Sequence, residues 1–404
     1  MKEWKQYKLI DILDKVIDYR GKTPQKTESG IPLITAKIIK DGRILPPNEF
    51  IAENNYEKWM VRGIPQEGDV VLTVEAPLGE VAQLDNRKIA LAQRVVTLRG
   101  KKGVLDNTYL KYFLMSNIGQ ARLKARETGT TVTGIKQSEL REVLIDCPDY
   151  TTQIKIASIL NAIDAKIELN RQINDNLEQQ LQALYNEWFL ENPKSDWHSV
   201  NLSEIATFVS GYSYKGNELM ENSDTAMATI KNFERNGGFK IDGYKPIIPS
   251  AKLKVDQRAR LFDILVAHTD LTQNAEVIGN AEILLSKDIY KDLIFSMDLV
   301  KVNAKESFPF QFLLALLLKN SRFKSHCIGY VNGTTVLHMN KRALPDYETI
   351  IPNLEDAQNI NATAKAIFCQ MSENLTEISN LTKMRDTLLP KLMSGELKIN
   401  EIDC

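Results

Sequence analysis

The chain has 404 residues, enough for two or three domains with separate hydrophobic cores. Its composition, 43% hydrophobic and 25% charged, is ordinary for a soluble protein, and no run approaches the roughly eighteen apolar residues of a membrane-spanning helix. The formal net charge of −1 and the pI near 6.5 give no overall signature of a nucleic-acid binder, although such a footprint can be local.

The cysteines and the N-terminus point to the cellular compartment. The four cysteines are scattered and form no CxxC pair, which argues against a zinc site and for free thiols; they are Cys147, Cys327, Cys369 and Cys404. The first residues lack the apolar stretch of a signal peptide. We therefore expect a cytoplasmic protein that does not contact a membrane.

Residues 1–150 are predicted to form a first globular domain of mixed α/β type. Short apolar runs broken by Gly, Pro and Asn predict strands at 68–74 and 95–98. A helical stretch over roughly 107–127 closes this part of the chain.

Residues 151–195 are predicted to contain one long helix. Apolar or amide side chains recur at alternating steps of four and three residues, the spacing of a coiled-coil seam. The seam positions are Ile156, Leu160, Ile163, Ile167, Asn170, Asn174, Leu177, Leu181, Leu184 and Trp188.

The same two kinds of segment then follow again. Residues 196–352 are predicted to form a second mixed domain, with strands at 263–267 and 299–302 and a helical stretch at 309–324. Residues 353–404 carry the second seam, and Pro390 is expected to end or kink its helix near the last turn. The seam positions are Ile360, Ala364, Ile367, Met371, Asn374, Ile378, Leu381, Arg385, Leu388 and Leu392.

The second half of the chain therefore repeats the first. The stretch that begins at Gly129 recurs at Gly333, in each case followed by Thr-Thr-Val. Farther upstream, Trp4, Leu9, Ile12 and Tyr19 recur as Trp197, Leu202, Ile205 and Tyr212. A period near two hundred residues is too long for a solenoid repeat, so the pattern indicates a duplicated module of one globular domain and one helix.

A regular seam needs a helical partner, and the other helix of the same chain is the obvious candidate. An antiparallel pair would give the molecule an approximate two-fold axis across the pair. Asn170 and Asn374 lie near the middle of their seams. We expect the two side chains to hydrogen-bond to each other and to fix the register at some cost in stability. The alternative is that both helices are ordinary amphipathic core helices.

Several stretches resemble the specificity subunits of type I restriction-modification systems. They occur in the family's order and cover essentially the whole chain; they are Pro32–Gly42, Pro77–Ala82, Leu91–Arg94, Thr229–Phe233, Thr269–Gly279 and Leu388–Leu397. The resemblance implies an α+β fold in which residues 1–150 and 196–352 are target-recognition domains. Residues 151–195 and 353–404 are then helical spacer regions.

The resemblance also implies a function. Each recognition domain would read one half of a bipartite, asymmetric sequence in double-stranded DNA. The helices would dock two modification subunits, which bind S-adenosylmethionine and methylate adenine, and motor-nuclease subunits would join for restriction. The chain itself would then be no enzyme and need no cofactor. Helices of about 35 residues span roughly 50 Å, which is the length of roughly fifteen base pairs of DNA. Each recognition domain covers several of these base pairs, which leaves a gap of roughly six to eight base pairs between the half-sites.

Independent features of the sequence argue against chemistry on this chain. There is neither a GxxxxGK[ST] loop for ATP nor an Asn/Asp-Pro-Pro-Tyr motif for adenine methylation. Asp69 and Glu75 are spaced as in a nuclease site, but Ala76 and Pro77 follow where a lysine would help. The histidines have no metal-ligand spacing; they are His198, His268, His326 and His338.

DNA binding needs cations for phosphates and planar donors or acceptors for base edges. The strongest local groups follow strand-like runs at similar depth in each domain: Lys37, Lys40 and Arg43, and Lys231, Asn232 and Arg235. A second pair of groups follows the next runs: Thr73, Glu75 and Arg94, and His268, Thr269, Thr272 and Gln273. For each residue the alternative is a solvated turn or a hydrogen bond that only orders the loop.

The glycine-threonine stretches complete the candidate DNA site. Thr130, Thr131, Thr334 and Thr335 follow glycines just before the chain enters the helices, where backbone and hydroxyl groups can approach a phosphate closely. A purely structural turn is the alternative. At the level of the whole chain, the alternatives are a coiled-coil adaptor that does not bind DNA and a specificity subunit of another methyltransferase-based defence system.

Overall fold

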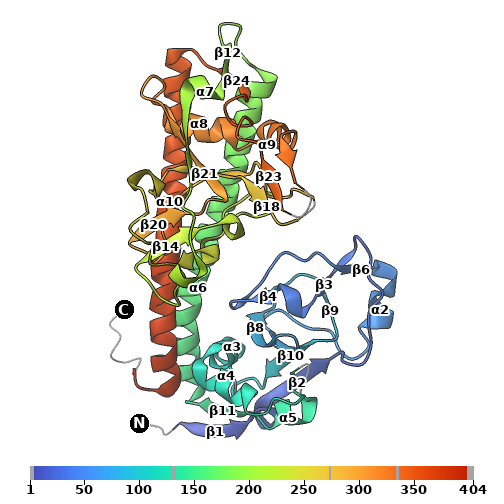
Figure 1. Cartoon of the computed structure of the whole chain (residues 1–404). Coiled ribbons are helices and arrows are strands. Elements are labelled where there is room, and N and C mark those ends of the chain that lie inside the picture. Colours follow the sequence, from blue (N-terminus) through green and yellow to red (C-terminus); the bar gives the residue numbers. More distant parts are fainter. Residues whose placement is uncertain (1–3, 130–132, 273, 334–335, 398–404) are drawn as a thin grey trace. The chain divides into compact units, whose positions relative to one another are not determined.

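The computed structural model describes residues 4–129, 133–272, 274–333 and 336–397, and Figure 1 shows their order along the chain. The chain divides into two compact units. Unit 1 comprises residues 1–166 and 381–404, and unit 2 comprises residues 167–380. Each unit thus contains one globular region together with segments of two long helices.

The centre of unit 1 is a four-stranded antiparallel sheet with the order β2-β10-β7-β8. Its strands are β2 (Leu13–Asp18), β7 (Val70–Val74), β8 (Leu78–Gln83) and β10 (Val95–Gly100). All of β7 is buried: Val70, Leu72 and Val74 lie in the core that contains α3 (Asn107–Met115), whereas Val71 lies in a second core. Both faces are therefore covered, which fits a strand whose residues are all apolar except Thr73.

Smaller elements complete unit 1. A three-stranded sheet has the order β6-β3-β9, β4 and β5 form a hairpin, and β1 pairs with β11. Their bounds are β1 (Lys5–Lys8), β3 (Ile31–Ile34), β4 (Ile39–Lys40), β5 (Arg43–Ile44), β6 (Phe50–Ile51), β9 (Ala90–Leu91) and β11 (Leu144–Cys147). The remaining helices are α1 (Leu9–Ile12), α2 (Tyr56–Trp59), α4 (Asn117–Lys124) and α5 (Gln137–Arg141).

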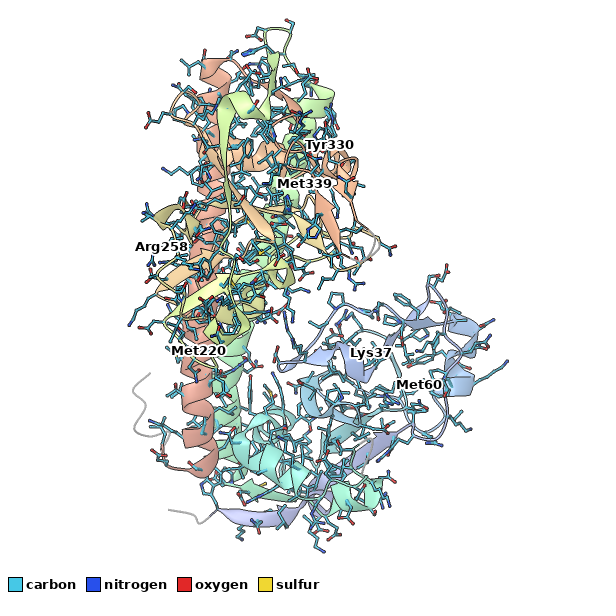
Figure 2. The ribbon with its side chains drawn as sticks, viewed as in Figure 1. Lys37, Met60, Met220, Arg258, Tyr330 and Met339 are labelled. Carbon is cyan, nitrogen blue, oxygen red and sulfur yellow. The ribbon has the colours of Figure 1, made fainter. Side chains whose placement is uncertain are left out.

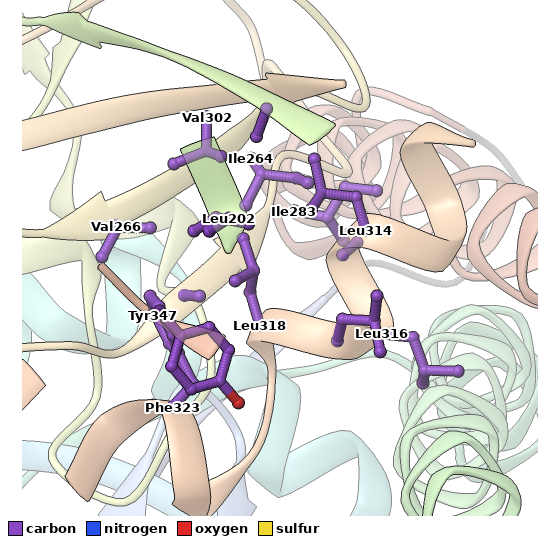
Figure 3. Packing of buried hydrophobic residues seen from close by; sticks show 14 of the residues in the cluster. Leu202, Ile264, Val266, Ile283, Val302, Leu314, Leu316, Leu318, Phe323 and Tyr347 are labelled. Atoms are coloured by element: carbon purple, nitrogen blue, oxygen red, sulfur yellow. The ribbon is translucent and has the colours of Figure 1, made fainter. Parts of the chain in front are cut away.

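Unit 2 has a central antiparallel sheet with the order β13-β21-β17-β19, beside the sheets β15-β14-β20-β16 and β18-β23-β22 and the pair β12-β24. The strands are β12 (His198–Asn201), β13 (Ala206–Ser210), β14 (Thr225–Ala228), β15 (Lys245–Pro246), β16 (Arg258–Ala259), β17 (Ile264–Ala267), β18 (Thr269–Asp270), β19 (Ala281–Ile283), β20 (Asp292–Phe295), β21 (Leu299–Ala304), β22 (Val331–Asn332), β23 (Leu337–Met339) and β24 (Glu348–Ile351). The helices are α7 (Leu202–Ile205), α8 (Gln311–Leu318) and α9 (Ser321–Ile328). Figure 3 shows part of the apolar core between the central sheet and these helices.

The two units share one topology, as the sequence repeat predicts. The order β2-β10-β7-β8 in unit 1 corresponds to β13-β21-β17-β19 in unit 2, and β3 pairs parallel with β9 as β14 does with β20. The helical stretch predicted at 107–127 is two helices, α3 and α4. Ser116 has an extended backbone and caps α4 by accepting a hydrogen bond from Gly119 N. Asn320 has the same role before α9.

Two long helices carry the predicted seams. α6 (Tyr150–Tyr185) has 36 residues and is followed by a π-helical segment, Asn186–Glu191, while α10 (Leu354–Ser394) has 41 residues. None of the twenty predicted seam positions is exposed. In each unit the contacts between α6 and α10 are antiparallel, because Asp164 meets Arg385 and Asn174 meets Asn374. The predicted antiparallel pair is therefore confirmed.

Two details of the helix pair differ from expectation. α10 does not end at Pro390 but continues to Ser394. Asn170 and Asn374 do not bond to each other: Asn170 Nδ2 donates to Glu377 Oε2 at 2.7 Å, and Asn374 Nδ2 donates to Asn174 Oδ1 at 2.8 Å. In this register Asn374 lies opposite Asn174, one turn along α6 from Asn170. The buried polar layer exists, but its partners are shifted by that turn.

Unit 1 contains a buried ionic cluster where α3, α6 and α10 meet. Asp164 accepts hydrogen bonds from Tyr112 Oη at 2.7 Å, Arg385 Nη1 at 3.1 Å and Lys111 Nζ at 3.2 Å. Burial lowers the pKa of Lys111, although Asp164 opposes this effect. The sequence offset that relates Asn170 to Asn374 also relates Asp164 to Phe368 and Leu181 to Arg385. Unit 2 therefore has apolar residues at the positions equivalent to this ionic cluster.

The last turns of α10 belong to the core of unit 1. Leu389, Leu392 and Met393 are buried in the same cluster as Leu160 of α6. The division into compact units thus cuts across both helices. The four segments predicted from the sequence (1–150, 151–195, 196–352 and 353–404) remain a prediction about functional boundaries.

Candidate nucleic-acid interface

In unit 1 the segment after the first glycine-threonine stretch closes on the end of β7. Gly134 forms β-bridges with Glu75 and Thr128, and Ile135 N donates to Val74 O at 2.9 Å. A Cβ added to Gly134 would lie 2.8 Å from Val74 O, so this close approach requires glycine. Thr128, Gly134 and Ile135 are therefore held against the strand end that carries the predicted base-reading residues.

Glu75 and Arg94 meet at this strand end. Arg94 Nε lies 3.6 Å from Glu75 Oε1, and the two side chains are 48% and 37% exposed, so both are accessible to a ligand. A guanidinium can donate to the O6 and N7 atoms of guanine, and a carboxylate can accept from N4 of cytosine. The structure thus brings together two of the predicted residues in a position that suits base recognition.

Thr73, in contrast, is not available to DNA. Its side chain is fully buried, and Oγ1 accepts a hydrogen bond from Glu80 N at 2.9 Å, where the register between β7 and β8 shifts. This bond satisfies a backbone group at the bulge. The prediction that Thr73 contacts DNA is wrong.

The first cationic group lies on a different element. Lys37 is exposed in the 3-10 turn η1 (Ala36–Ile38) (Figure 2). Lys40 is exposed on β4. Arg43, on β5, is half-buried. The intervening Asp41-Gly42 turn has φ values of +52° and +82°, the left-handed conformation that suits a two-residue hairpin. Lys37 and Lys40 remain candidates for phosphate contacts.

The corresponding group of unit 2 contains two exposed cations and one buried amide. Lys231 is exposed, and Arg235 is 70% exposed and paired with Glu276 at 3.0 Å. Asn232 is fully buried in η5 (Ile230–Asn232): its Oδ1 accepts from Thr229 N, and its Nδ2 donates to Lys240 O at 2.7 Å. Because both ends of this amide bond to the backbone, the prediction that Asn232 contacts DNA is wrong.

The β18-β23 pair of unit 2 holds the remaining candidates. Thr269 is 4% exposed and donates to Asp298 Oδ1 at 3.1 Å, so the predicted DNA contact of Thr269 is also wrong. Thr272 is half-buried, and its N and Oγ1 both donate to Asp270 Oδ1, which orders the loop. Gln273, Thr130, Thr131, Thr334 and Thr335 lie outside the described residues.

His268 is half-buried beside this loop. Burial lowers the pKa of its imidazole, and the nearby His338 and Lys341 lower it further, while Asp298 opposes them. A neutral imidazole at neutral pH offers one donor and one acceptor to a base edge. His338 and Lys341 are exposed and were not among the predicted residues.

The sequence also gave no indication of a cationic groove in unit 1. A groove of about 320 Å³ is lined by Asp18, Arg20, Arg62, Lys136 and Gln137. Arg20 donates from Nη1 to Ile135 O at 2.5 Å and also pairs with Asp18, so the groove adjoins loop 128–136. These cations are far apart along the chain and only the fold brings them together.

Two further findings concern the class of protein. In the part of the chain that the structure describes, no helix is long and apolar enough to cross a membrane. Within those same residues, no three His, Cys, Asp or Glu side chains are grouped so that they could hold a metal ion.

Comparison with known proteins defines the class. The family model described as the type I restriction modification DNA specificity domain matches residues 1–179. The type I restriction enzyme MjaIX specificity subunit of Methanocaldococcus jannaschii is 27% identical over 99% of this chain and 95% of its own length. The HindI specificity subunit of Haemophilus influenzae is 24% identical over 98% of this chain and all of its own length.

A solved structure extends the similarity to the fold. The crystal structure of a type I restriction-modification S subunit from M. genitalium superimposes with a TM-score of 0.58 and 18% identity, over 96% of both chains. The duplicated α+β units and the antiparallel helices thus share the fold of that S subunit. Residues 1–179 thus match the family's DNA specificity domain, and over nearly its whole length the chain is similar to type I restriction-modification specificity subunits.

Proposed function

We propose that this chain is the DNA-recognition subunit of a type I restriction-modification enzyme. Each unit reads one half of a bipartite site in double-stranded DNA. The paired helices α6 and α10 dock two modification subunits, which bind S-adenosylmethionine, and motor-nuclease subunits join the complex for restriction. The chain itself supplies recognition and no catalysis.

One observation carries the proposal. The two units share a topology, but the polar residues at their equivalent strand ends differ: the accessible Glu75 and Arg94 in unit 1, and the half-buried His268 with the exposed His338 in unit 2. A duplicated scaffold with different contact residues suits two unlike half-sites. It also suits a common surface for two copies of one partner.

The decisive experiment is to express the chain with its modification subunit and to map methylated adenines across the genome. A bipartite motif is the expected result. Arg94→Ala should relax the motif at one base position, at a cost of about 1–3 kcal/mol in discrimination. Lys37→Ala should weaken binding to all sequences alike and reduce its salt dependence.

Fluorescence anisotropy with duplex DNA separates this proposal from a coiled-coil adaptor. The complex of the chain and the modification subunit should bind labelled duplex more tightly when the duplex contains the motif. If the complex forms but binds no duplex, the chain is an adaptor and not a reader of DNA. If Arg94→Ala leaves every position of the motif unchanged, the assignment of Arg94 fails while the proposed function stands.

A further inference from the structure

A buried tyrosine anchors one loop in each unit, and the two tyrosines occupy equivalent positions of the repeat. Tyr19, 1% exposed, donates from Oη to Gly63 O at 3.0 Å and accepts from Arg62 N at 2.9 Å. Tyr212, 3% exposed, bonds through Oη to Ser250 Oγ at 2.9 Å and accepts from Ser250 N at 3.1 Å. We call residues 60–66 of unit 1 and 247–255 of unit 2 the tyrosine-anchored loops.

Both loops present positive charge. In unit 1 the exposed Arg62 lines the groove that Arg20 and Lys136 share. In unit 2 Lys252 and Lys254 are exposed, and within the described residues neither has a carboxylate partner within 4.0 Å. The surrounding stretch 245–260 contains five Lys or Arg residues and one Asp, in a chain whose net charge is −1. Such a local excess is the footprint of an anionic ligand.

Aliphatic side chains accompany these cations at both sites. Val61 and Ile64 are 68% and 57% exposed in unit 1, and Ile248 and Val255 are 59% and 81% exposed in unit 2. Apart from the anchoring tyrosines, the loops share little sequence. The two units therefore share a structural feature rather than a sequence: an anchored loop with exposed cationic and aliphatic side chains.

The two tyrosine-anchored loops differ in their relation to the candidate interface of their own unit. In unit 1 Arg62 Nη1 donates to Arg20 O at 2.8 Å, and Arg20 in turn bonds to loop 128–136 (Met60, at the start of the anchored loop, is labelled in Figure 2). In unit 2 Met297 N donates to Tyr212 O, and His268 N donates to the carbonyl of the following residue, Asp298, at 2.8 Å. The unit 1 loop thus adjoins the candidate interface. The unit 2 loop is linked to it only through Tyr212, and its Lys254 lines a groove with Asp263, Lys301 and Asn303, at the other end of β17 and β21 from His268.

We infer that the tyrosine-anchored loops bind the phosphates of the DNA, one loop for each half-site, through Arg62 in unit 1 and through Lys252 and Lys254 in unit 2. This inference rests on the proposed function. Contacts of this kind set the position of each unit on the duplex and carry no sequence information. The anchored loops are separate from the strand ends that carry the predicted base-reading residues.

The test measures how the affinity for duplex DNA depends on salt. The complex of the full chain with its modification subunit is titrated with duplex that contains the methylated motif, from about 0.1 to about 1 M salt. Each phosphate contact contributes about 0.9 to the slope of log K against log salt, which is about eightfold in affinity over that range. Arg62→Gln should lower the slope by one such increment, and the double variant Lys252→Gln/Lys254→Gln by two.

A matched control removes the same charge elsewhere. Lys102 follows β10, at the far end of this strand from Arg94. Lys102→Gln should leave the slope unchanged. Because Arg62 also bonds to backbone carbonyls, Arg62→Lys separates charge from structure: a phosphate contact is restored by lysine, whereas a purely structural role is not.

The outcomes distinguish the two proposals. If the wild-type complex binds no duplex, the proposed function fails and this inference fails with it. If the wild type binds duplex but the loop variants keep its full slope, only the inference is overturned. If the variants lose the modification subunit rather than affinity for DNA, the loops contact protein, which also overturns it. In the supporting result, affinity falls equally on all sequences and the methylated motif is unchanged.

Discussion

Replacement of Asp164 with alanine should destabilise unit 1 strongly. Its carboxylate is the shared acceptor for Tyr112, Lys111 and Arg385, whose bonds come from α3 and α10. In Asp164→Ala the ammonium of Lys111 stays buried without its anion. Arg385 keeps its ion pair with Asp386, 2.9 Å away, so most of the lost electrostatic stabilisation is that of Lys111.

The magnitude follows from burial. The side chains of Lys111, Arg385 and Asp164 are 7%, 15% and 18% exposed, so solvent screens their interactions weakly. Removal of one partner from a buried ion pair costs about 3–5 kcal/mol, and we expect about 3 kcal/mol because Arg385 keeps a partner. For a domain of about 150–250 residues this lowers the melting temperature by about 6–12 °C.

Differential scanning calorimetry measures this shift, and hydrogen exchange at the amides of α3 assigns it to unit 1. Asp386→Ala is the matched control, because that carboxylate is 59% exposed and its ion pair contributes less than about 1 kcal/mol. A shift for Asp164→Ala no larger than that of the control would refute the argument. So would a shift confined to unit 2.

Three further predictions concern the helix pair, a histidine and a glycine. Leucine at either Asn174 or Asn374 should cost about 1–2 kcal/mol because the other amide loses its partner across the helix pair, whereas the double replacement should cost less than the two single ones together; a double-mutant cycle measures the difference. The folded pKa of His268 lies below its ordinary 6.5, so the unfolded chain takes up the proton first as the pH falls. Stability of unit 2 should therefore drop as the pH falls through 6.5, and melting curves at about pH 7.5 and about pH 5.5 should show a smaller drop for His268→Gln. Gly134→Ala should displace residues 134 and 135 from Val74 and weaken DNA binding, whereas Gly216→Ala, in open space, should not; equal binding by the two variants would contradict this role.

The helices and the duplication were predictable because their signals repeat. Seam residues recur every three or four positions in both copies, so one irregular residue such as Arg385 does not hide the pattern. The register in which α6 pairs with α10 was harder to predict. The amides at 170 and 374 are equivalent in the repeat, but the antiparallel partner of Asn374 is set by packing along the whole pair, which sequence spacing does not specify.

The candidate site was only partly predictable because burial is not visible in the sequence. Thr73, Asn232 and Thr269 are polar residues near strand ends, which is also true of base-reading residues. In the structure each one satisfies a buried polar partner instead. The groove cations Arg20, Arg62 and Lys136 were missed for the opposite reason, since only tertiary folding brings them together.

The completion of unit 1 by the last turns of α10 affects how the protein is made. Leu389, Leu392 and Met393 leave the ribosome long after the rest of the core that they fill. At about 5–20 residues per second, roughly 10–40 s separate the synthesis of residue 166 from that of residue 381. During this time the nascent first unit exposes the apolar surface of α6. A chain that terminates early cannot cover this surface itself, so the surface stays exposed to chaperones and proteases, which can remove truncated copies.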